Sequence, residues 1–254
     1  MQQFKITLAY DGTDFVGWQR QATGTSIQGL VEAALRELDQ RDVTVIGAGR
    51  TDAGVHALGQ VASFALERAI DADTVVRALN ARLPADVRVV AAEPVAAAFH
   101  ARYDARAKTY RYRIWNADVV IPFERRYVWH LTDRLDAGAM AEAAALLEGS
   151  HDFAAFQAAG SDVATTARHI TRSLVSLSDH EPLITYEICG DGFLRHMVRT
   201  IAGTLVEIGR GRRPPRWIAE VLAGRDRASA GATAPAAGLF LVSVEYARVL
   251  AAES

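Results

Sequence analysis

Residues 47–60 have the sequence GAGRTDAGVHALGQ, in which Arg50, Asp52 and His56 stand among glycines and other small residues. One interpretation is a structural turn, because Asp bonds nearby backbone groups and Gly accepts a positive φ. A second is a dinucleotide-binding loop, since Gly47-x-Gly49 after a strand is how that motif begins. The second is disfavoured, because Asp52 takes the third glycine's place and would repel a pyrophosphate.

The third interpretation is a catalytic carboxylate. Glycines allow a substrate to approach the backbone closely. On extended backbone, Arg50 and Asp52 are two residues apart and point to the same side. An arginine there would keep the carboxylate ionised, and an ionised, positioned carboxylate can act as a nucleophile. His56 is expected to be structural. The composition of the stretch leaves the turn and the catalytic carboxylate both open.

The bulk composition limits the class of protein. The chain has 254 residues, half of them hydrophobic, and a net charge of −2, so a core is available and any nucleic-acid surface must be local. With Cys189 as the single cysteine, no disulfide can form within the chain. Neither a zinc motif nor a signal-peptide pattern is present, and the most apolar helical stretch carries charges. We expect a soluble, cytoplasmic protein without a metal site.

Hydrophobic periodicity predicts the elements of the first half. Alternation predicts strands at 4–10, 43–46, 60–66 and 87–92. An apolar stripe predicts a helix at 27–38, with Thr25 and Gln28 at the spacing of a capping box. A second helix should begin at Asp71 and end before Pro84.

The second half repeats this order of strands and helices. Strands are predicted at 108–115, 170–178, 183–189 and 239–246, and helices at 135–147, at 193–208 and after Pro215. Tyr110 and Tyr112 should face inward from the first of these strands. On the 193–208 helix, Arg195 and Arg199 should share a face. Helix and strand signals lapse near 100–107, which predicts a boundary between two halves, 1–104 and 105–254.

Six motifs give the chain a resemblance to a known family. They are YDGTDFVGWQRQ (10–21), SIQGLVEAAL (26–35), GAGRTDAGVHALGQV (47–61), FHARYDARAKTYRYRI (99–114), FLRHMVRTIAG (193–203) and GLFLVSVEY (238–246). In this order they resemble the tRNA pseudouridine synthase A family along nearly the whole chain. Tyr103 departs mildly from the family's usual Phe, and the 160–170 loop lacks a cysteine often found there.

The resemblance implies the fold and the reaction. The fold would be the α+β fold of pseudouridine synthases, with two related α/β halves around a central, mostly antiparallel sheet and the active-site cleft between them. The reaction would be isomerisation of uridine to pseudouridine at positions 38, 39 and 40 of the tRNA anticodon arm. It requires base flipping and no cofactor, and the enzyme would be a homodimer with tRNA spanning both subunits.

The resemblance also assigns roles to residues. It implies that Asp52 is the catalytic aspartate and that Tyr110 and Arg199 complete the catalytic set. We expect Arg199 to pair with Asp52. Arg50, Tyr110 and Arg168 are the expected RNA-binding residues. Three routes stay open for Asp52: attack on C1′, addition to C6 of uracil, or help in removing the C2′ proton. The alternative class is an RNA-binding protein without catalysis, which the joint presence of the three catalytic candidates disfavours.

Overall fold

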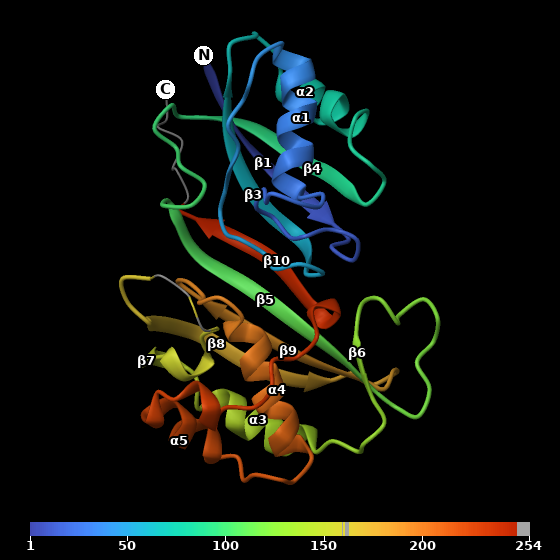
Figure 1. The fold of residues 1–254 in the computed structure, drawn as a ribbon, viewed down its shortest axis with the longest axis vertical. Coiled ribbons are helices and arrows are strands. Elements are labelled where there is room, and N and C mark those ends of the chain that lie inside the picture. The colour runs from blue at the N-terminus through green and yellow to red at the C-terminus, as the bar shows by residue number, and fades with distance from the viewer. Residues whose placement is uncertain (159, 161–162, 248–254) are drawn as a thin grey trace. The chain divides into compact units, whose positions relative to one another are not determined.

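The computed structural model describes residues 1–158, 160 and 163–247. Within them the chain forms ten β-strands and five α-helices, and the strand pairs include antiparallel ones and the parallel pair of β5 with β6 (Figure 1). The predicted α+β class is confirmed. The chain divides into two compact units, the first made of Met1–Lys108 and Leu241–Ser254, the second of Thr109–Phe240. The last strand thus returns to the first unit, whereas the predicted halves follow sequence order alone.

The first unit is a sheet in the order β4-β1-β3-β10 with two helices packed against it (Figure 1). Its elements are β1 (Gln2–Tyr10), α1 (Ile27–Asp39), β2 (Ile46–Gly47), β3 (His56–Leu66), α2 (Ala72–Asn80), β4 (Val87–Val95) and β10 (Leu239–Tyr246). Alternate residues of β1 from Phe4 to Tyr10 are buried, and the apolar stripe of α1 is buried as predicted. Asp71 caps α2.

The second unit has the strand order β5-β9-β8-β7, with β6 parallel to β5. Its elements are β5 (Ala105–Asn116), β6 (Trp129–Leu131), α3 (Ala137–Ala145), β7 (Gly149–Asp152), β8 (Ala167–Leu177), β9 (Leu183–Gly190), α4 (Met197–Gly209) and α5 (Trp217–Gly224). Eleven of the thirteen residues of α4 are buried, as expected of a helix that is apolar all round. This helix is the core of the second unit.

The structure corrects three predictions. The strand predicted at 43–46 is reduced to Ile46–Gly47. Helix α1 is capped by Ser26 rather than Thr25, because the Ser26 hydroxyl accepts the hydrogen bond from Gly29 N–H. Helix α4 begins at Met197, not at 193, because the residue before it has a left-handed backbone with φ of +62°. Arg195 therefore lies outside α4 and shares no helix face with Arg199.

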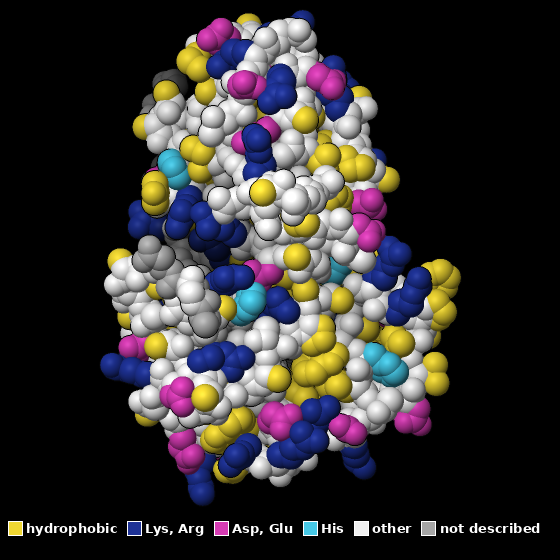
Figure 2. All heavy atoms as spheres, in the orientation of Figure 1, with side chains coloured by type: hydrophobic (Ala, Val, Ile, Leu, Met, Phe, Trp, Pro, Cys, Tyr) yellow, Lys and Arg dark blue, Asp and Glu magenta, His cyan; other side chains and the backbone are white. Residues whose placement is uncertain are grey.

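The surface carries charges of both signs. On the face shown in Figure 2, Lys and Arg side chains are spread over the molecule with acidic side chains between them. This agrees with the net charge of −2. No helix in the described part of the chain is long and apolar enough to cross a membrane. A nucleic-acid surface must therefore depend on local geometry rather than on a uniformly basic face.

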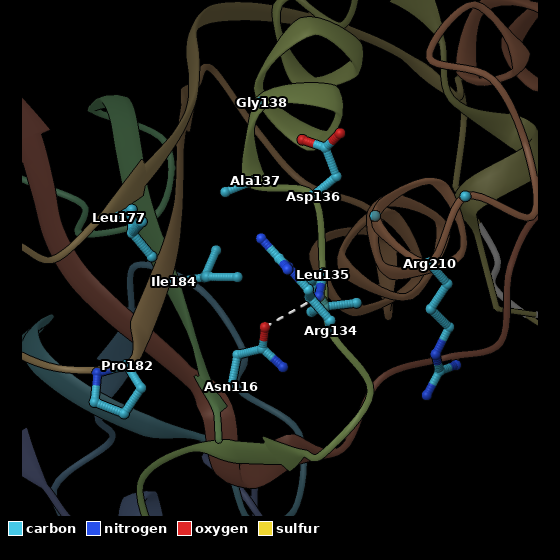
Figure 3. A pocket seen from close by; sticks show the side chains of 12 residues that line it. Asn116, Arg134, Leu135, Asp136, Ala137, Gly138, Leu177, Pro182, Ile184 and Arg210 are labelled. Carbon is cyan, nitrogen blue, oxygen red and sulfur yellow. Dashed lines mark hydrogen bonds between the residues drawn. The ribbon is translucent and has the colours of Figure 1, made fainter. Parts of the chain in front are cut away.

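A pocket of about 830 Å³ lies in the second unit, at the start of α3 (Figure 3). Two of the charged side chains that line it, Asp136 and Arg210, have structural partners. Asp136 caps α3 through Ala139 N–H at 2.9 Å. Arg210 forms ion pairs with Asp133 (2.9 Å) and Glu207 (2.9 Å). None of the predicted site residues lines this pocket.

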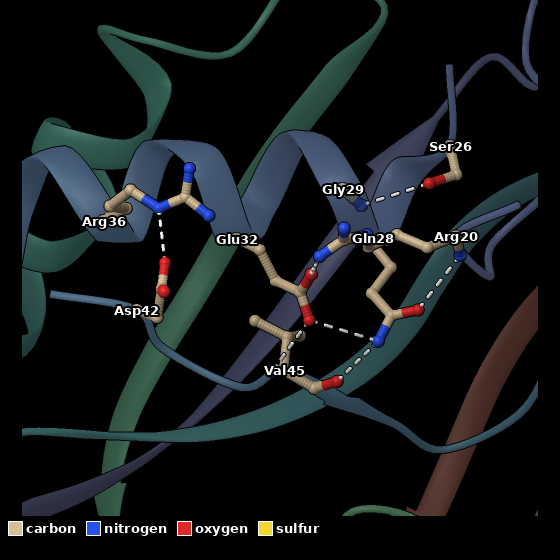
Figure 4. Close-up of polar contacts among 8 residues, drawn as sticks. All are labelled: Arg20, Ser26, Gln28, Gly29, Glu32, Arg36, Asp42 and Val45. Atoms are coloured by element: carbon tan, nitrogen blue, oxygen red, sulfur yellow. Dashed lines mark hydrogen bonds and ion pairs between the residues drawn. The ribbon is translucent and has the colours of Figure 1, made fainter. Parts of the chain in front are cut away.

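Side chains of helix α1 bind the segment before the helix, at Arg20, and the segment that leads to the glycine-rich stretch, at Val45 (Figure 4). The Gln28 side chain accepts from Arg20 N–H (3.2 Å) and donates to the carbonyl of Val45 (3.0 Å). Glu32 accepts from the Arg20 guanidinium (3.3 Å) and from Val45 N–H (3.3 Å). The backbone N–H and carbonyl of Val45 are thus bound by side chains of α1 instead of a neighbouring strand, which explains why the predicted strand is shortened at this point.

The capping correction gives a direct test. Replacing Ser26 by Ala removes the bond to Gly29 N–H and is expected to lower the free energy of unfolding by about 1 kcal/mol. Urea denaturation followed by circular dichroism measures it. The matched control is Thr25→Ala, whose exposed side chain is not the cap and whose loss should leave the midpoint unchanged. A larger effect at Thr25 than at Ser26 would contradict the assigned cap.

Candidate active site

The glycine-rich stretch is a strand end, a turn and a second strand. Ala48 N–H donates to the carbonyl of Val61 (2.8 Å), which continues the pairing of β2 with β3. Val55 N–H then donates to the carbonyl of Asp52 (3.1 Å), and Gly54 has φ of +75°, which closes a turn. Asp52 therefore opens a tight turn. Because β3 follows rather than a helix, the dinucleotide interpretation is wrong.

Two glycines allow the 11–18 loop to lie directly on this turn. A Cβ at Gly12 would come within 2.0 Å of the carbonyl oxygen of Val55. A Cβ at Gly17, whose φ is +102°, would lie 2.5 Å from the carbonyl oxygen of Thr51. Neither position has room for a side chain. The backbone on both sides of Asp52 is thus fixed by direct contact with a second segment of backbone.

Trp18 closes the same contact from the side. Its ring is buried, and a Cβ at Gly47 would lie 2.4 Å from it. Trp18 N–H donates to the carbonyl of Thr51 (3.1 Å), and Gly54 N–H donates to that of Phe15 (3.3 Å). Trp18 therefore shapes the candidate site through the packing of its ring and through its backbone hydrogen bond to Thr51.

Buried polar side chains support the turn from below. The Tyr10 hydroxyl lies 2.9 Å from Thr51 Oγ1, and Gln60 Nε2 donates to the carbonyl of Gly49 (3.0 Å). Burial raises the pKa of Tyr10 to about 12, against the opposing effect of hydrogen bonds with Thr51 and Gln60. The phenol is therefore neutral at physiological pH. Tyr10 and Gln60 lie within two of the motifs, but no supporting role was predicted for either from the sequence.

His56 is part of this support. The ring is 1% exposed, and its Nδ1 accepts the N–H of Gly12 at 3.0 Å. The same nitrogen lies 3.1 Å from Asp11 Oδ1. His56 therefore connects β3 to the 11–18 loop, in agreement with the structural role expected for it.

The turn and the residues just before it carry two charged side chains, Asp52 and Arg50. Asp52 is half-buried and Arg50 is exposed. Lys108 also approaches this stretch, with its Cε 3.4 Å from where a Cβ of Gly49 would stand. The stem of the lysine side chain thus packs beside Gly49. No individual role was predicted for Lys108, because only the structure brings position 108 to position 49.

Tyr110 and Tyr112 differ in environment, although both side chains face the same side of β5. The Tyr110 ring is 7% exposed and meets Phe193 edge to face, with centroids 5.0 Å apart. Tyr112 is fully buried, donates to the carbonyl of Pro235 (2.7 Å), and has a pKa raised by burial. Tyr112 belongs to the core as expected, whereas Tyr110 lies at its margin.

Arg199 holds a loop against α4. Its Nε donates to the carbonyl of Ala234 (2.8 Å), and its own carbonyl accepts Ala234 N–H (3.1 Å). The loop packs so tightly that a Cβ at Gly203 would lie 1.8 Å from the carbonyl oxygen of Ala232. Arg227 binds the same loop through Thr233 Oγ1 (3.0 Å). The orientation of the Arg199 guanidinium is therefore set by the 231–235 loop.

Arg168 is the second residue of β8 and is half-buried. Its Nη1 donates to the carbonyl of Thr165 (2.9 Å), and its side chain lies beside Gly192, where a Cβ would be 3.3 Å from Nε. It lies in the 160–170 segment, which lacks the cysteine often found in the family. Residues 159, 161 and 162 lie outside the described residues.

The predicted site residues fall into both units. Asp52 and Arg50 belong to the first, and Tyr110, Arg168 and Arg199 to the second. The ion pair expected between Arg199 and Asp52 stays a prediction. Among the described residues, no group of three or more His, Cys, Asp or Glu side chains could hold a metal ion.

Comparisons with known proteins find relatives that match nearly the whole chain. The sequence model of a family described as tRNA pseudouridine synthase matches residues 6–104 and 143–247. A tRNA pseudouridine synthase A of Moorella thermoacetica is 52% identical over 97% of this chain and 100% of its own length. That of Myxococcus xanthus is 48% identical over 97% and 92%. A crystal structure of a Cbf5-Nop10-Gar1 complex aligns at 16% identity with a TM-score of 0.33, covering 80% of this chain and 45% of that chain.

The contact at Gly17 can be tested by its steric effect. Gly17→Ala adds a Cβ against Thr51 and imposes a left-handed alanine, whereas Gly211→Ala imposes the same kind of backbone, at φ of +71°, in open space. The strain alone is worth about 1–2 kcal/mol. We expect Gly17→Ala to lose clearly more stability than Gly211→Ala in urea denaturation. Equal losses would show that the loops can separate without cost.

Proposed function

We propose, because the chain belongs to the tRNA pseudouridine synthase family, that it converts uridine to pseudouridine in the anticodon arm of tRNA, at positions 38, 39 and 40. The chain is accordingly an isomerase, and its α+β architecture is that of the pseudouridine synthase fold. The observation that carries the proposal is Asp52 itself. It opens a turn whose backbone is locked by the 11–18 loop, in a chain 52% identical to a tRNA pseudouridine synthase A.

The reaction is balanced without a cofactor. The bond from N1 of uracil to C1′ of the ribose breaks, the base rotates, and a bond from C5 to C1′ forms. The hydrogen on C5 leaves as a proton, and N1 takes up a proton. Nothing is oxidised or reduced, so the protein must supply a nucleophile or base, proton transfer and a fixed geometry.

Asp52 is the proposed nucleophile. Its half-buried carboxylate stands on a backbone that cannot shift without separating two loops, so its position is set before substrate arrives. Attack on C1′ would follow the logic of retaining glycosidases. Addition to C6 and assistance in removing the C2′ proton use the same carboxylate, and all three remain routes within the proposal.

Tyr110 is proposed to meet the reacting base. Its ring packs on Phe193, and its 7% exposure leaves one edge at the margin of the core. The ring could stack on the flipped uracil, which is worth roughly 1–3 kcal/mol for a base on an aromatic side chain. The hydroxyl could also carry a proton to or from the base. Both roles require Tyr110 to face the substrate.

Arg199 is proposed to pair with Asp52. Because its Nε is committed to the Ala234 carbonyl, such a pair would use the Nη nitrogens. The planar guanidinium can serve two acceptors in fixed directions at once, which an ammonium cannot. The role therefore requires arginine and not merely a positive charge.

Arg50 and Arg168 are proposed to bind RNA. The enzyme must extrude its target uridine from the stack. The exposed Arg50, two residues before Asp52, would fill the vacated space or hold a phosphate. Arg168 would contact phosphate from the edge of β8. By family resemblance the enzyme would act as a cytoplasmic homodimer with tRNA spanning both subunits.

The first experiment is release of tritium from unmodified tRNA labelled at C5 of uridine. Forming the C5–C1′ bond must expel the C5 hydrogen, so wild type should release it. Asp52→Asn should bind tRNA but reduce release to background, because the amide is not a nucleophile. Release by both proteins would remove Asp52 from the chemistry. Binding without release by wild type would make the chain an RNA-binding protein.

A second experiment separates two duties of Arg199. Arg199→Lys keeps the charge but loses the bond to Ala234 and the guanidinium fork, and we expect kcat to fall at least tenfold. Arg227→Lys is the matched control, because Arg227 anchors the same loop through Gly231 and Thr233. It should keep kcat within about threefold of wild type. Equal losses would assign Arg199 to loop anchoring alone.

A further inference from the structure

An exposed aromatic side chain stands on the turn that follows β4. Tyr103 is 75% exposed. Its ring is stacked with that of His100, with centroids 4.2 Å apart and an interplanar angle of 28°. The Arg102 guanidinium carbon lies 5.9 Å from the Tyr103 centroid. An exposed tyrosine supported by a second ring and a cation is a surface that can receive a flat ligand.

The turn is internally fixed. The His100 Nδ1 accepts the N–H groups of Arg102 and Tyr103, each at 3.2 Å. The Asp104 carboxylate accepts His100 N–H at 2.8 Å, and Asp104 N–H donates back to the carbonyl of His100 at 3.1 Å. Two ends of the turn are thus tied to each other. The Tyr103 ring is held in one place rather than on a loose loop.

The turn is also anchored in the first unit. Ala101 is fully buried; its N–H donates to Ser63 Oγ (3.2 Å), and its carbonyl accepts the Tyr246 hydroxyl (2.7 Å). The Tyr246 ring packs on Phe99, with centroids 5.1 Å apart. This anchoring means that binding at Tyr103 would require little ordering of the protein, which favours affinity.

We propose that Tyr103 is a stacking platform for an unpaired nucleobase of the RNA substrate, additional to Tyr110. The inference rests on the proposed function, which supplies RNA as the ligand. Its neighbours agree with that ligand: Arg102 lies beside the ring, Arg106 is exposed at the start of β5, and both can hold flanking phosphates. Aromatic faces interleaved with cations are how proteins bind single-stranded RNA. A protein partner would instead require apolar neighbours, and those of Tyr103 are charged.

The test is the affinity for labelled, unmodified tRNA, measured by fluorescence anisotropy at several salt concentrations. Tyr103→Ala should weaken binding about 5- to 150-fold, the range for loss of one stacked base. Tyr103→Phe and Tyr103→Trp keep a ring and should stay within about threefold of wild type. The slope of log K against log salt should not change for these variants, because no charge is lost. Arg106→Ala should reduce that slope by about one.

Val90→Ala is the matched control, because Val90 is an apolar side chain of the same unit, 56% exposed, and lacks a ring. It should bind tRNA as wild type does. Because Tyr103 is exposed, Tyr103→Ala should also unfold at the wild-type midpoint.

Three results would overturn the platform. They are wild-type affinity in Tyr103→Ala, equal losses in Tyr103→Phe and Tyr103→Ala, and weakened self-association in sedimentation with tRNA affinity intact. The last would make Tyr103 a contact with a second copy of the chain. If wild type binds and modifies tRNA in these cases, only this inference fails. A wild type that neither binds nor modifies tRNA would remove the proposed function as well.

Discussion

The contact between two stretches of backbone, 11–18 and 51–55, is the constraint on which the candidate site depends. At Gly12 and Gly17 the opposing carbonyl oxygens stand where a Cβ would be. Such a close approach fixes the direction of the peptide units on both sides of Asp52, because rotation of these units would bring backbone atoms of the two segments into collision. A catalytic group is effective when its position is set before the substrate binds, because no reorganisation is then needed during reaction. Gly12 and Gly17 therefore serve one purpose, which is to let the 11–18 loop pack directly on residues 51–55.

Much of the fold follows from local patterns in the sequence. Alternation located β1 and β5, and the apolar stripe located α1, because one face of each is buried. The failures have equally local causes. Thr25 and Ser26 are adjacent and both able to cap, so only the backbone conformation selects between them. His196, the residue before α4, has a left-handed backbone conformation, and the periodicity of apolar residues carries no information about such a conformation. The backbone of Val45 is bound by the side chains of Gln28 and Glu32, and contacts between segments this far apart cannot be predicted from the spacing of residues in the sequence.

The candidate site likewise contains residues that could be predicted from local sequence and residues that could not. Asp52 stood out because a carboxylate among glycines is unusual and because the surrounding motif resembles that of a known family. Tyr10 and Gln60 did not, since their roles depend on how β1 and β3 pair. The register sets Tyr10 opposite Ala57 and Leu8 opposite Gln60, and a shift of one residue would turn these side chains to the other face. Register is a non-local property, so the support beneath the turn could not be predicted from the stretch itself.

The chemistry of that support explains how a carboxylate is tolerated there. The groups around the Tyr10 hydroxyl are the neutral side chains of Thr51 and Gln60, and burial keeps Tyr10 protonated with a pKa of about 12. Neutral groups that bond to one another add no uncompensated buried charge, which would be expensive. Asp52 itself is only half-buried, so its carboxylate keeps part of its surface in contact with solvent. The arrangement therefore separates rigidity from charge, because uncharged, buried groups fix the backbone that carries the half-buried carboxylate.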